Sequence, residues 1–249
     1  MNYLTQIGIL ALFVLQVFAG GKDLPAEFER CKRDENFDKC LVEAVNKALV
    51  ILKDGYPSFD IPPLEPLRVP TLVVESGRNA PVTLKQVFKN VTVYDMIKTS
   101  KVTEYRTKLD KNLIVCDSFT DRVELVADYE MTGRILLFPI TGRGRANLTL
   151  INLKIEHHLI GEPIEKDGEI YNILKEYKVN LKPKRVYMHF DNLFGDKVLS
   201  DSLNRIINEN WELVFNEMKQ GYAKDFGLVF KNITNKLFEH IPMDKIFLR

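Results

Sequence analysis

The sequence predicts an α+β fold in which a highly curved antiparallel β-sheet wraps around a long C-terminal α-helix. Two observations predict it. Residues 82–190 alternate between apolar and polar side chains, as strands with one buried and one wetted face do. Residues 197–241 contain no proline and are apolar around most of a helix's circumference, so this helix must be buried on most sides. A flat sheet cannot bury such a helix, whereas a curved sheet can.

The N-terminal segment has the pattern of a secretory signal peptide. Residues 7–19 are almost wholly apolar, and no charged side chain precedes Lys22. This run is shorter than the roughly 20 residues that span a bilayer, and the small residues at 19–21 provide two candidate cleavage points. We expect residues 1–21 to be a signal peptide and residues 22–249 to form one domain. An uncleaved anchor or a core helix is the alternative.

The cysteines and sequons agree with the secretory pathway. In a secreted chain, Cys31 and Cys40 are close enough in sequence to favour a disulfide between them. Cys116 is then left as a buried free thiol, with intermolecular pairing as the alternative. Sequons begin at Asn90, Asn147 and Asn232, and each is a glycosylation acceptor only where it is exposed. We therefore expect a secreted, extracellular glycoprotein.

A helix and an extended linker are predicted to follow. Apolar residues recur at helical spacing in the second half of 27–54, and Gly55 ends the run. Residues 56–70 contain five prolines, which exclude a regular helix or a central strand. We expect this linker to lie fixed on the surface of the domain.

Short turns between the predicted strands indicate an antiparallel sheet. Turn signals occur at 141–144, 166–168 and 182–184. The apolar parity changes from even to odd near Leu150–Ile151, and a bulge there would curve the sheet. If the first two sequons carry sugar, the side chains that point inward beside them are Val91, Val93, Leu148 and Leu150.

The last segment predicts one helix of unusual length. As a single helix, residues 197–241 would extend about 65 Å. Its apolar residues recur at steps of about 3.8, so the apolar stripe spirals slowly around the helix. Gly221 and Gly227 are the glycines of this segment, and we expect a kink or break at one of them.

The candidate ligand-binding residues are the inward side chains of the sheet and the apolar face of the helix. A dry hollow between these two surfaces would hold a small apolar molecule. On the pattern alone, ordinary core packing explains each residue equally well. The candidates are Val91, Val93, Met131, Ile135, Leu137, Trp211, Phe215, Met218, Tyr222 and Phe226.

Several motifs occur together along the chain. The Cys31 and Cys40 pair precedes a helix and a proline-rich stretch, and Gly142-Arg143-Gly144 precedes a long strand. The C-terminal motifs are Asn192-Leu193-Phe194, Gly195-Asp196-Lys197, Leu203-Asn204, Asn208-Glu209-Asn210-Trp211, Ile241-Pro242-Met243 and Ile246-Phe247. In these features the sequence resembles the takeout/juvenile hormone-binding protein family of insects, over nearly the whole chain after the signal peptide.

The resemblance implies a lipid-transfer-like fold with an internal hydrophobic tunnel and no metal, cofactor or catalysis. The juvenile hormone-binding branch of the family has a second disulfide, which Cys116 alone cannot form. The sequence is therefore more similar to the takeout-like branch. The family often has a proline in the middle of the long helix, where this chain has residues 219–221. We expect a monomeric carrier of a small apolar ligand, such as a terpenoid, a fatty acid or a similar lipid.

Other function classes are less well supported. The lipid-transfer likeness also allows a membrane-surface or immune-type lipid-binding protein, but 35 basic against 34 acidic residues give no strongly charged face. The same balance disfavours nucleic acid, and no later apolar run is long enough for stable membrane insertion. An esterase would need an activated serine, and no G-x-S-x-G motif occurs. His157 and His158 are adjacent on a predicted strand and point to opposite faces, so we expect no metal site.

Overall fold

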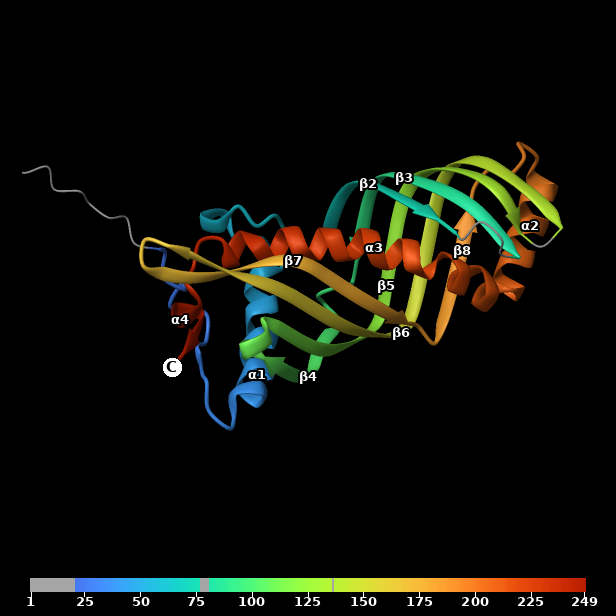
Figure 1. The fold of residues 1–249 in the computed structure, drawn as a ribbon. Coiled ribbons are helices and arrows are strands. Elements are labelled where there is room, and N and C mark those ends of the chain that lie inside the picture. Colours follow the sequence, from blue (N-terminus) through green and yellow to red (C-terminus); the bar gives the residue numbers. More distant parts are fainter. Residues whose placement is uncertain (1–20, 77–80, 136) are drawn as a thin grey trace, which may run out of the picture.

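The computed structural model of this protein describes residues 21–76, 81–135 and 137–249. Apart from Gly21, the predicted signal peptide lies outside the described residues. In the described part of the chain, seven strands form an antiparallel sheet that curves around a long helix, which confirms the predicted fold class (Figure 1). The strand order is β2-β3-β5-β6-β7, with β4 paired to β5 and β8 paired to β6.

The strands differ greatly in length. They are β1 (Cys31–Lys32), β2 (Leu67–Glu75), β3 (Val82–Tyr94), β4 (Ser100–Lys108), β5 (Leu113–Ile135), β6 (Phe138–Lys166), β7 (Glu169–Lys182), β8 (Arg185–Phe190) and β9 (Phe247–Leu248). The α-helices are α1 (Phe37–Leu52), α2 (Lys197–Glu209), α3 (Trp211–Phe238) and α4 (Met243–Ile246). Single 3₁₀ turns lie at Pro57–Phe59 and Leu109–Lys111.

Two long strands, β5 and β6, form the spine of the sheet. They pair along the whole of β5, from Leu113↔Ile160 to Ile135↔Phe138, and β6 continues beyond this pairing to Lys166. The first half of β5 pairs with β4 and the second half with β3. The first half of β6 pairs with β8 and the second half with β7. The molecule therefore has two halves along the spine, one bordered by β2, β3 and β8 and the other by β4 and β7.

The inward parity of β6 changes where the two halves meet, as the sequence predicts. Leu148 is buried on one parity and Leu153 on the other. A bulge would shift the pairing of β6 with its neighbour. No shift occurs between β5 and β6, which stay in register from Thr120↔Leu153 to Arg122↔Ile151, so the predicted bulge is wrong. β5 changes its own parity at the same level. The irregularity lies in the backbone of Asn152, whose φ is 48°.

The C-terminal helical segment is interrupted at Asn210, between α2 and α3, and not at a glycine. A Cβ atom on Gly221 would lie 2.7 Å from Cγ1 of Val74 in β2. A Cβ atom on Gly227 would lie 2.2 Å from the carbonyl oxygen of Tyr177 in β7. The predicted break at a glycine is therefore wrong, because α3 runs through both glycines, which let the helix approach the two edges of the sheet. Figure 1 shows α3 (red) running along the sheet, with α2 (orange) at one end.

Helix side chains satisfy backbone groups along the edges of this open sheet. In the described part of the chain, four asparagine side chains each bond both the N–H and the C=O of a single strand residue. These pairs are Asn46 with Val102, Asn204 with Phe190, Asn208 with Met188 and Asn235 with Leu174. Asp225 of α3 accepts a hydrogen bond from the N–H of Val73 in β2. A carboxamide carries one acceptor and two donors, so it can take the place of a neighbouring strand.

The two ends of the described chain meet beside α1. β1 pairs in parallel with β9. The Cys31–Cys40 disulfide joins β1 to α1 and confirms the predicted pairing. Cys116 is free and buried, as predicted. The predicted helix is also confirmed, and Gly55, with φ at 89°, follows its end.

The predicted linker is shorter than expected. β2 begins at Leu67, inside the segment 56–70 that is predicted to be an extended linker. Pro70 fits within β2 because β2 is an edge strand that pairs with β3 alone. The prolines exclude a central strand, as predicted, but they allow an edge strand.

One of the three predicted turns is wrong. Residues 141–144 lie inside β6, and the chain reverses before Phe138 instead. Gly144 packs closely against the segment after β8, since a Cβ atom there would lie 3.1 Å from Cβ of Asp191. The turns predicted at 166–168 and 182–184 are confirmed, because they join β6 to β7 and β7 to β8.

Candidate ligand-binding site

Among the described residues, two apolar cavities lie between the sheet and the helices. The larger, of about 320 Å³, lies in the half bordered by β4 and β7, against α1 and the C-terminal part of α3. The smaller, of about 60 Å³, lies in the other half, against the middle of α3. Met96, Ile155 and Phe230 contribute to the walls of both, so these three side chains separate the two cavities.

Most of the larger cavity has an aliphatic lining. It comes from α1, the strands β5 and β6, and α3, and includes Leu41, Leu52, Ile114, Leu159, Ile233 and Leu237. Of the described residues that line it, Glu29 is the only one with a formal charge, and Glu29 is paired with Lys47. The cavity therefore favours an apolar, uncharged occupant.

One wall of the larger cavity is polar. Strand pairing places Tyr105 beside Cys116, and Cys116 beside His157. Ser118 lies two residues after Cys116, and its Oγ is 2.8 Å from Nε2 of His157. The hydroxyl oxygen of Tyr177 is 3.1 Å from Nδ1 of the same ring. The imidazole of His157 is thus held at both nitrogens, and all five residues line the cavity.

The groups of this wall are uncharged at neutral pH. Burial lowers the pKa of His157 to about 4, so the imidazole is neutral. Burial raises the pKa of the Cys116 thiol to about 12, which leaves no thiolate nucleophile there. Burial also raises the pKa of Tyr105 and of Tyr177 above the ordinary value. The wall can therefore offer hydrogen bonds but no ionic contact.

The contact between Ser118 and His157 has the geometry of a nucleophile and its base, but the rest of a hydrolytic triad differs. A triad carries a carboxylate at the second imidazole nitrogen, to orient the ring and stabilise its protonated form. Here the phenol of Tyr177 lies at that nitrogen. This arrangement suits recognition of a polar group better than acyl transfer.

Four of the ten candidate residues predicted from the sequence line the smaller cavity. They are Val93, Phe215, Tyr222 and Phe226. Val91, Ile135 and Met218 are buried but line neither cavity among the described residues. Trp211 is partly buried and stacks on Arg185, whose Cζ lies 5.4 Å from the ring centroid.

The prediction that Leu137 faces the interior is wrong. Leu137 is 87% exposed. It lies between the end of β5 and the start of β6, where strand alternation no longer determines the direction of a side chain. Met131, another candidate, is buried, and its Sδ accepts a hydrogen bond from Nε2 of Gln86.

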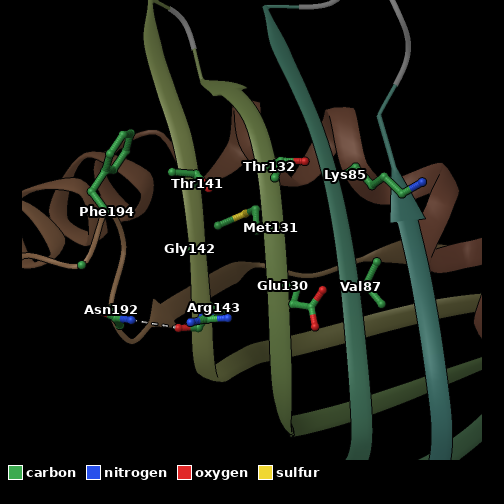
Figure 2. Close-up of a pocket in the computed structure, with 11 residues that line it drawn as sticks. Lys85, Val87, Glu130, Met131, Thr132, Thr141, Gly142, Arg143, Asn192 and Phe194 are labelled. Carbon is green, nitrogen blue, oxygen red and sulfur yellow. Dashed lines mark hydrogen bonds between the residues drawn. The ribbon is translucent and has the colours of Figure 1, made fainter.

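Met131 also borders a wide hollow of about 680 Å³ beside the segment that carries Phe194 (Figure 2). The strand side chains drawn around it are mostly polar, including Lys85, Glu130 and Arg143. Lys85 and Glu130 are each ion-paired, with Glu75 and Lys89 respectively. This polar hollow does not have the lining that an apolar ligand requires.

The polar wall of the larger cavity was missed by sequence reasoning. A signal for it is present in the strand parity. His157 shares its parity with the buried Ile155 and Leu159, and Ser118 shares its parity with Cys116. Polar residues at inward positions of a curved sheet indicate either a buried network or a binding site.

A curved sheet around a helix, with apolar cavities between them, is an architecture suited to binding hydrophobic ligands. A family model described as haemolymph juvenile hormone binding protein matches residues 9–248, and the chain belongs to this family. The family consists of proteins that bind or carry small hydrophobic molecules. The resemblance to the takeout/juvenile hormone-binding family is therefore confirmed.

Similar proteins agree with this assignment. The circadian clock-controlled protein daywake of Drosophila melanogaster is 26% identical over 254 residues, covering 98% of this chain and 96% of that protein. Daywake of Drosophila yakuba is 25% identical over 253 residues, covering 98% and 95%. The crystal structure of Epiphyas postvittana Takeout 1 superposes with a TM-score of 0.78 at 23% identity, over 89% of this chain and 100% of that one. In the described residues, no helix is long and apolar enough to cross a membrane.

Proposed function

We propose that this protein is a secreted, monomeric carrier that binds one small hydrophobic molecule in the larger cavity. The observation that carries the proposal is a cavity of about 320 Å³ with an aliphatic lining and one polar wall. Ligand pockets of proteins occupy about 300–1,000 Å³ and combine an apolar lining with a few placed polar groups. The cavity has both properties.

The apolar lining is sufficient for useful affinity. Burial of about 300 Å² of ligand surface contributes roughly 7 kcal/mol before the costs of association. This favours a terpenoid, a fatty-acid derivative or a similar lipid. A ligand longer than the larger cavity would pass Met96, Ile155 and Phe230 and reach the smaller cavity. There it would meet Val93, Phe215, Tyr222 and Phe226, as the sequence suggests.

Secretion is supported by covalent and surface features. The Cys31–Cys40 disulfide is typical of proteins that mature in an oxidising compartment, and the family model describes a haemolymph protein. The side chains of Asn90 and Asn232 are exposed, although Nδ2 of Asn90 donates a hydrogen bond to Asp128. Asn147 is half-buried and donates a hydrogen bond to Glu124, so we expect it to be modified less.

The first test is to identify what the protein carries. Protein secreted from insect cells would be examined by native mass spectrometry, then stripped of lipid and titrated with the uncharged fluorescent probe N-phenyl-1-naphthylamine. The proposal predicts a copurifying apolar molecule and saturable probe binding. A secreted chain without a bound molecule, which also fails to bind the probe after stripping, would refute it.

A pair of variants on α1 locates the binding site. Ala48 lines the larger cavity, whereas Val50 is 64% exposed on the same helix. Ala48→Trp should fill the cavity and weaken probe binding at least tenfold, because little volume remains for a guest. Val50→Trp should leave binding unchanged. Equal affinities for the two variants would place the ligand elsewhere.

A further inference from the structure

Three groups of the polar wall, Ser118, His157 and Tyr177, contain one more proton than the hydrogen bonds among them use. The hydroxyls of Ser118 and Tyr177 bring one proton each, and the neutral imidazole of His157 brings one. Two hydrogen bonds join these three groups, one at Nε2 and one at Nδ1. Two protons are therefore used and one remains.

The spare proton exists in both tautomers of the ring. When Nε2 carries the proton it donates to Ser118, and Tyr177 donates to Nδ1, so the proton of Ser118 is free. When Nδ1 carries the proton it donates to Tyr177, and Ser118 donates to Nε2, so the proton of Tyr177 is free. Both hydroxyl-bearing residues line the cavity. Ser118, His157 and Tyr177 together thus offer one hydrogen-bond donor to an acceptor in the cavity.

The same cavity has no cation to pair with an anion among the described residues that line it. Burial keeps the imidazole neutral, with a pKa of about 4. Glu29, the only residue with a formal charge among the described residues of the lining, is acidic and already paired with Lys47, so it provides no partner for a carboxylate. An anionic group in this cavity would lose its hydration without a compensating charge.

We propose that Ser118, His157 and Tyr177 anchor one uncharged oxygen of the ligand, so that the cavity selects a neutral ester, ether, ketone or alcohol over a carboxylate of the same chain length. The inference rests on the proposed carrier function and specifies its ligand class. The ligand accepts one hydrogen bond at the polar wall, and its hydrocarbon part lies against α1 and α3.

The test compares three ligands of similar size by displacement of N-phenyl-1-naphthylamine at pH 7.5: methyl dodecanoate, dodecanoate and tetradecane. With the unmodified protein, the methyl ester should bind at least tenfold more tightly than the acid. Equal binding of the acid and the ester would overturn the inference. This arm needs no variant.

The second arm removes the anchor. In the triple variant Ser118→Ala, His157→Phe, Tyr177→Phe, the affinity of the ester relative to tetradecane should fall about three- to tenfold, which is the worth of one net hydrogen bond. Apolar replacement of a whole buried network is tolerated better than removal of one partner. His158→Phe, at the neighbouring position on the opposite face of β6 and outside the cavity lining, is the control and should leave the ratio unchanged.

The outcomes separate the two proposals. If the triple variant still binds tetradecane and its affinity for the ester relative to tetradecane is unchanged, the anchor is overturned and the carrier function is left intact. Failure of all three ligands to displace the probe from the unmodified protein would overturn the carrier function and the anchor with it. Hydrolysis of methyl dodecanoate during the titration would also overturn the anchor, because the Ser118 and His157 pair would then be catalytic.

Discussion

The side-chain amide of Asn208 forms two hydrogen bonds with the backbone of Met188. Its Oδ1 accepts from the N–H at 2.9 Å, and its Nδ2 donates to the C=O at 2.6 Å. Asn208 belongs to α2 and Met188 to β8, an edge strand. The helix thereby supplies the hydrogen bonds that a further strand would otherwise provide.

Asn208→Ala should destabilise the protein by about 2–3 kcal/mol, because it leaves a buried donor and a buried acceptor of Met188 without partners. Asn210→Ala is the matched control, since the side chain of Asn210 bonds only Ile206 of its own helix. That change should cost about 1 kcal/mol or less. Urea unfolding measures both values. Equal losses would show that the contact with β8 contributes nothing specific.

Gly227→Ala should be destabilising although alanine favours helices. The added Cβ would lie 2.2 Å from the carbonyl oxygen of Tyr177, so α3 must move away from β7. Overpacking of this kind costs about 1–3 kcal/mol, of which better helix propensity offsets about 0.5–1 kcal/mol. At Gly221 the nearest atom belongs to the Val74 side chain, and the loss should be smaller. Thermal unfolding measures the stability of both variants. A lower stability of Gly221→Ala than of Gly227→Ala would contradict this explanation.

Phe230→Ala should join the two cavities. Phe230 lies in the walls of both, whereas Phe226 lines the smaller cavity alone. Opening the partition should shift preference from methyl dodecanoate toward methyl hexadecanoate by about threefold or more, at a stability cost of about 2–4 kcal/mol. Phe226→Ala enlarges one cavity without joining them and should leave the preference nearly unchanged. Probe displacement by the two esters measures the ratio, and a shift of the same size in both variants would contradict the role of Phe230.

The buried imidazole of His157 predicts loss of stability in acid. Its pKa is about 4 in the folded protein, against about 6.5 in the unfolded chain, so the unfolded chain binds the proton more readily. The stabilising effect is complete above pH 6.5 and is lost as the pH falls toward 4. It amounts to at most about 3 kcal/mol.

His157→Gln should reduce this pH dependence between pH 7 and pH 4.5, as measured by urea unfolding. Glutamine does not titrate but can still meet Ser118 and Tyr177. His158→Gln, on the opposite face of β6, should keep the dependence of the unmodified protein. If both variants kept the full pH dependence of the unfolding free energy, that dependence would come from the carboxylates of the protein and not from His157.

The general architecture could be predicted because it follows from periodicity. The sheet, the C-terminal helix and α1 each leave an apolar pattern that their burial requires. The Cys31–Cys40 disulfide could be predicted from spacing and compartment. The same periodicity placed Val93, Phe215, Tyr222 and Phe226 on inward faces, and they line the smaller cavity.

The larger cavity could not be predicted in this way, because its walls come from distant parts of the chain and its polar wall breaks the apolar pattern. His157 lies beside Cys116 only through the pairing of β5 with β6. The break at Asn210 and the close approaches of Gly221 and Gly227 depend on where α3 meets the sheet. Helix propensity alone predicts the break at a glycine. In the structure these glycines instead allow close packing of α3 against the sheet.

The pairing of β1 with β9 determines when the larger cavity is completed during synthesis. Cys31 and Phe247 are strand partners, and both line that cavity. At a translation rate of 5–20 residues per second, Phe247 is added roughly ten seconds or more after Cys31. The lining of the larger cavity is therefore incomplete until Phe247 has been added. A guest molecule can contact the whole lining only after Phe247 has paired with Cys31.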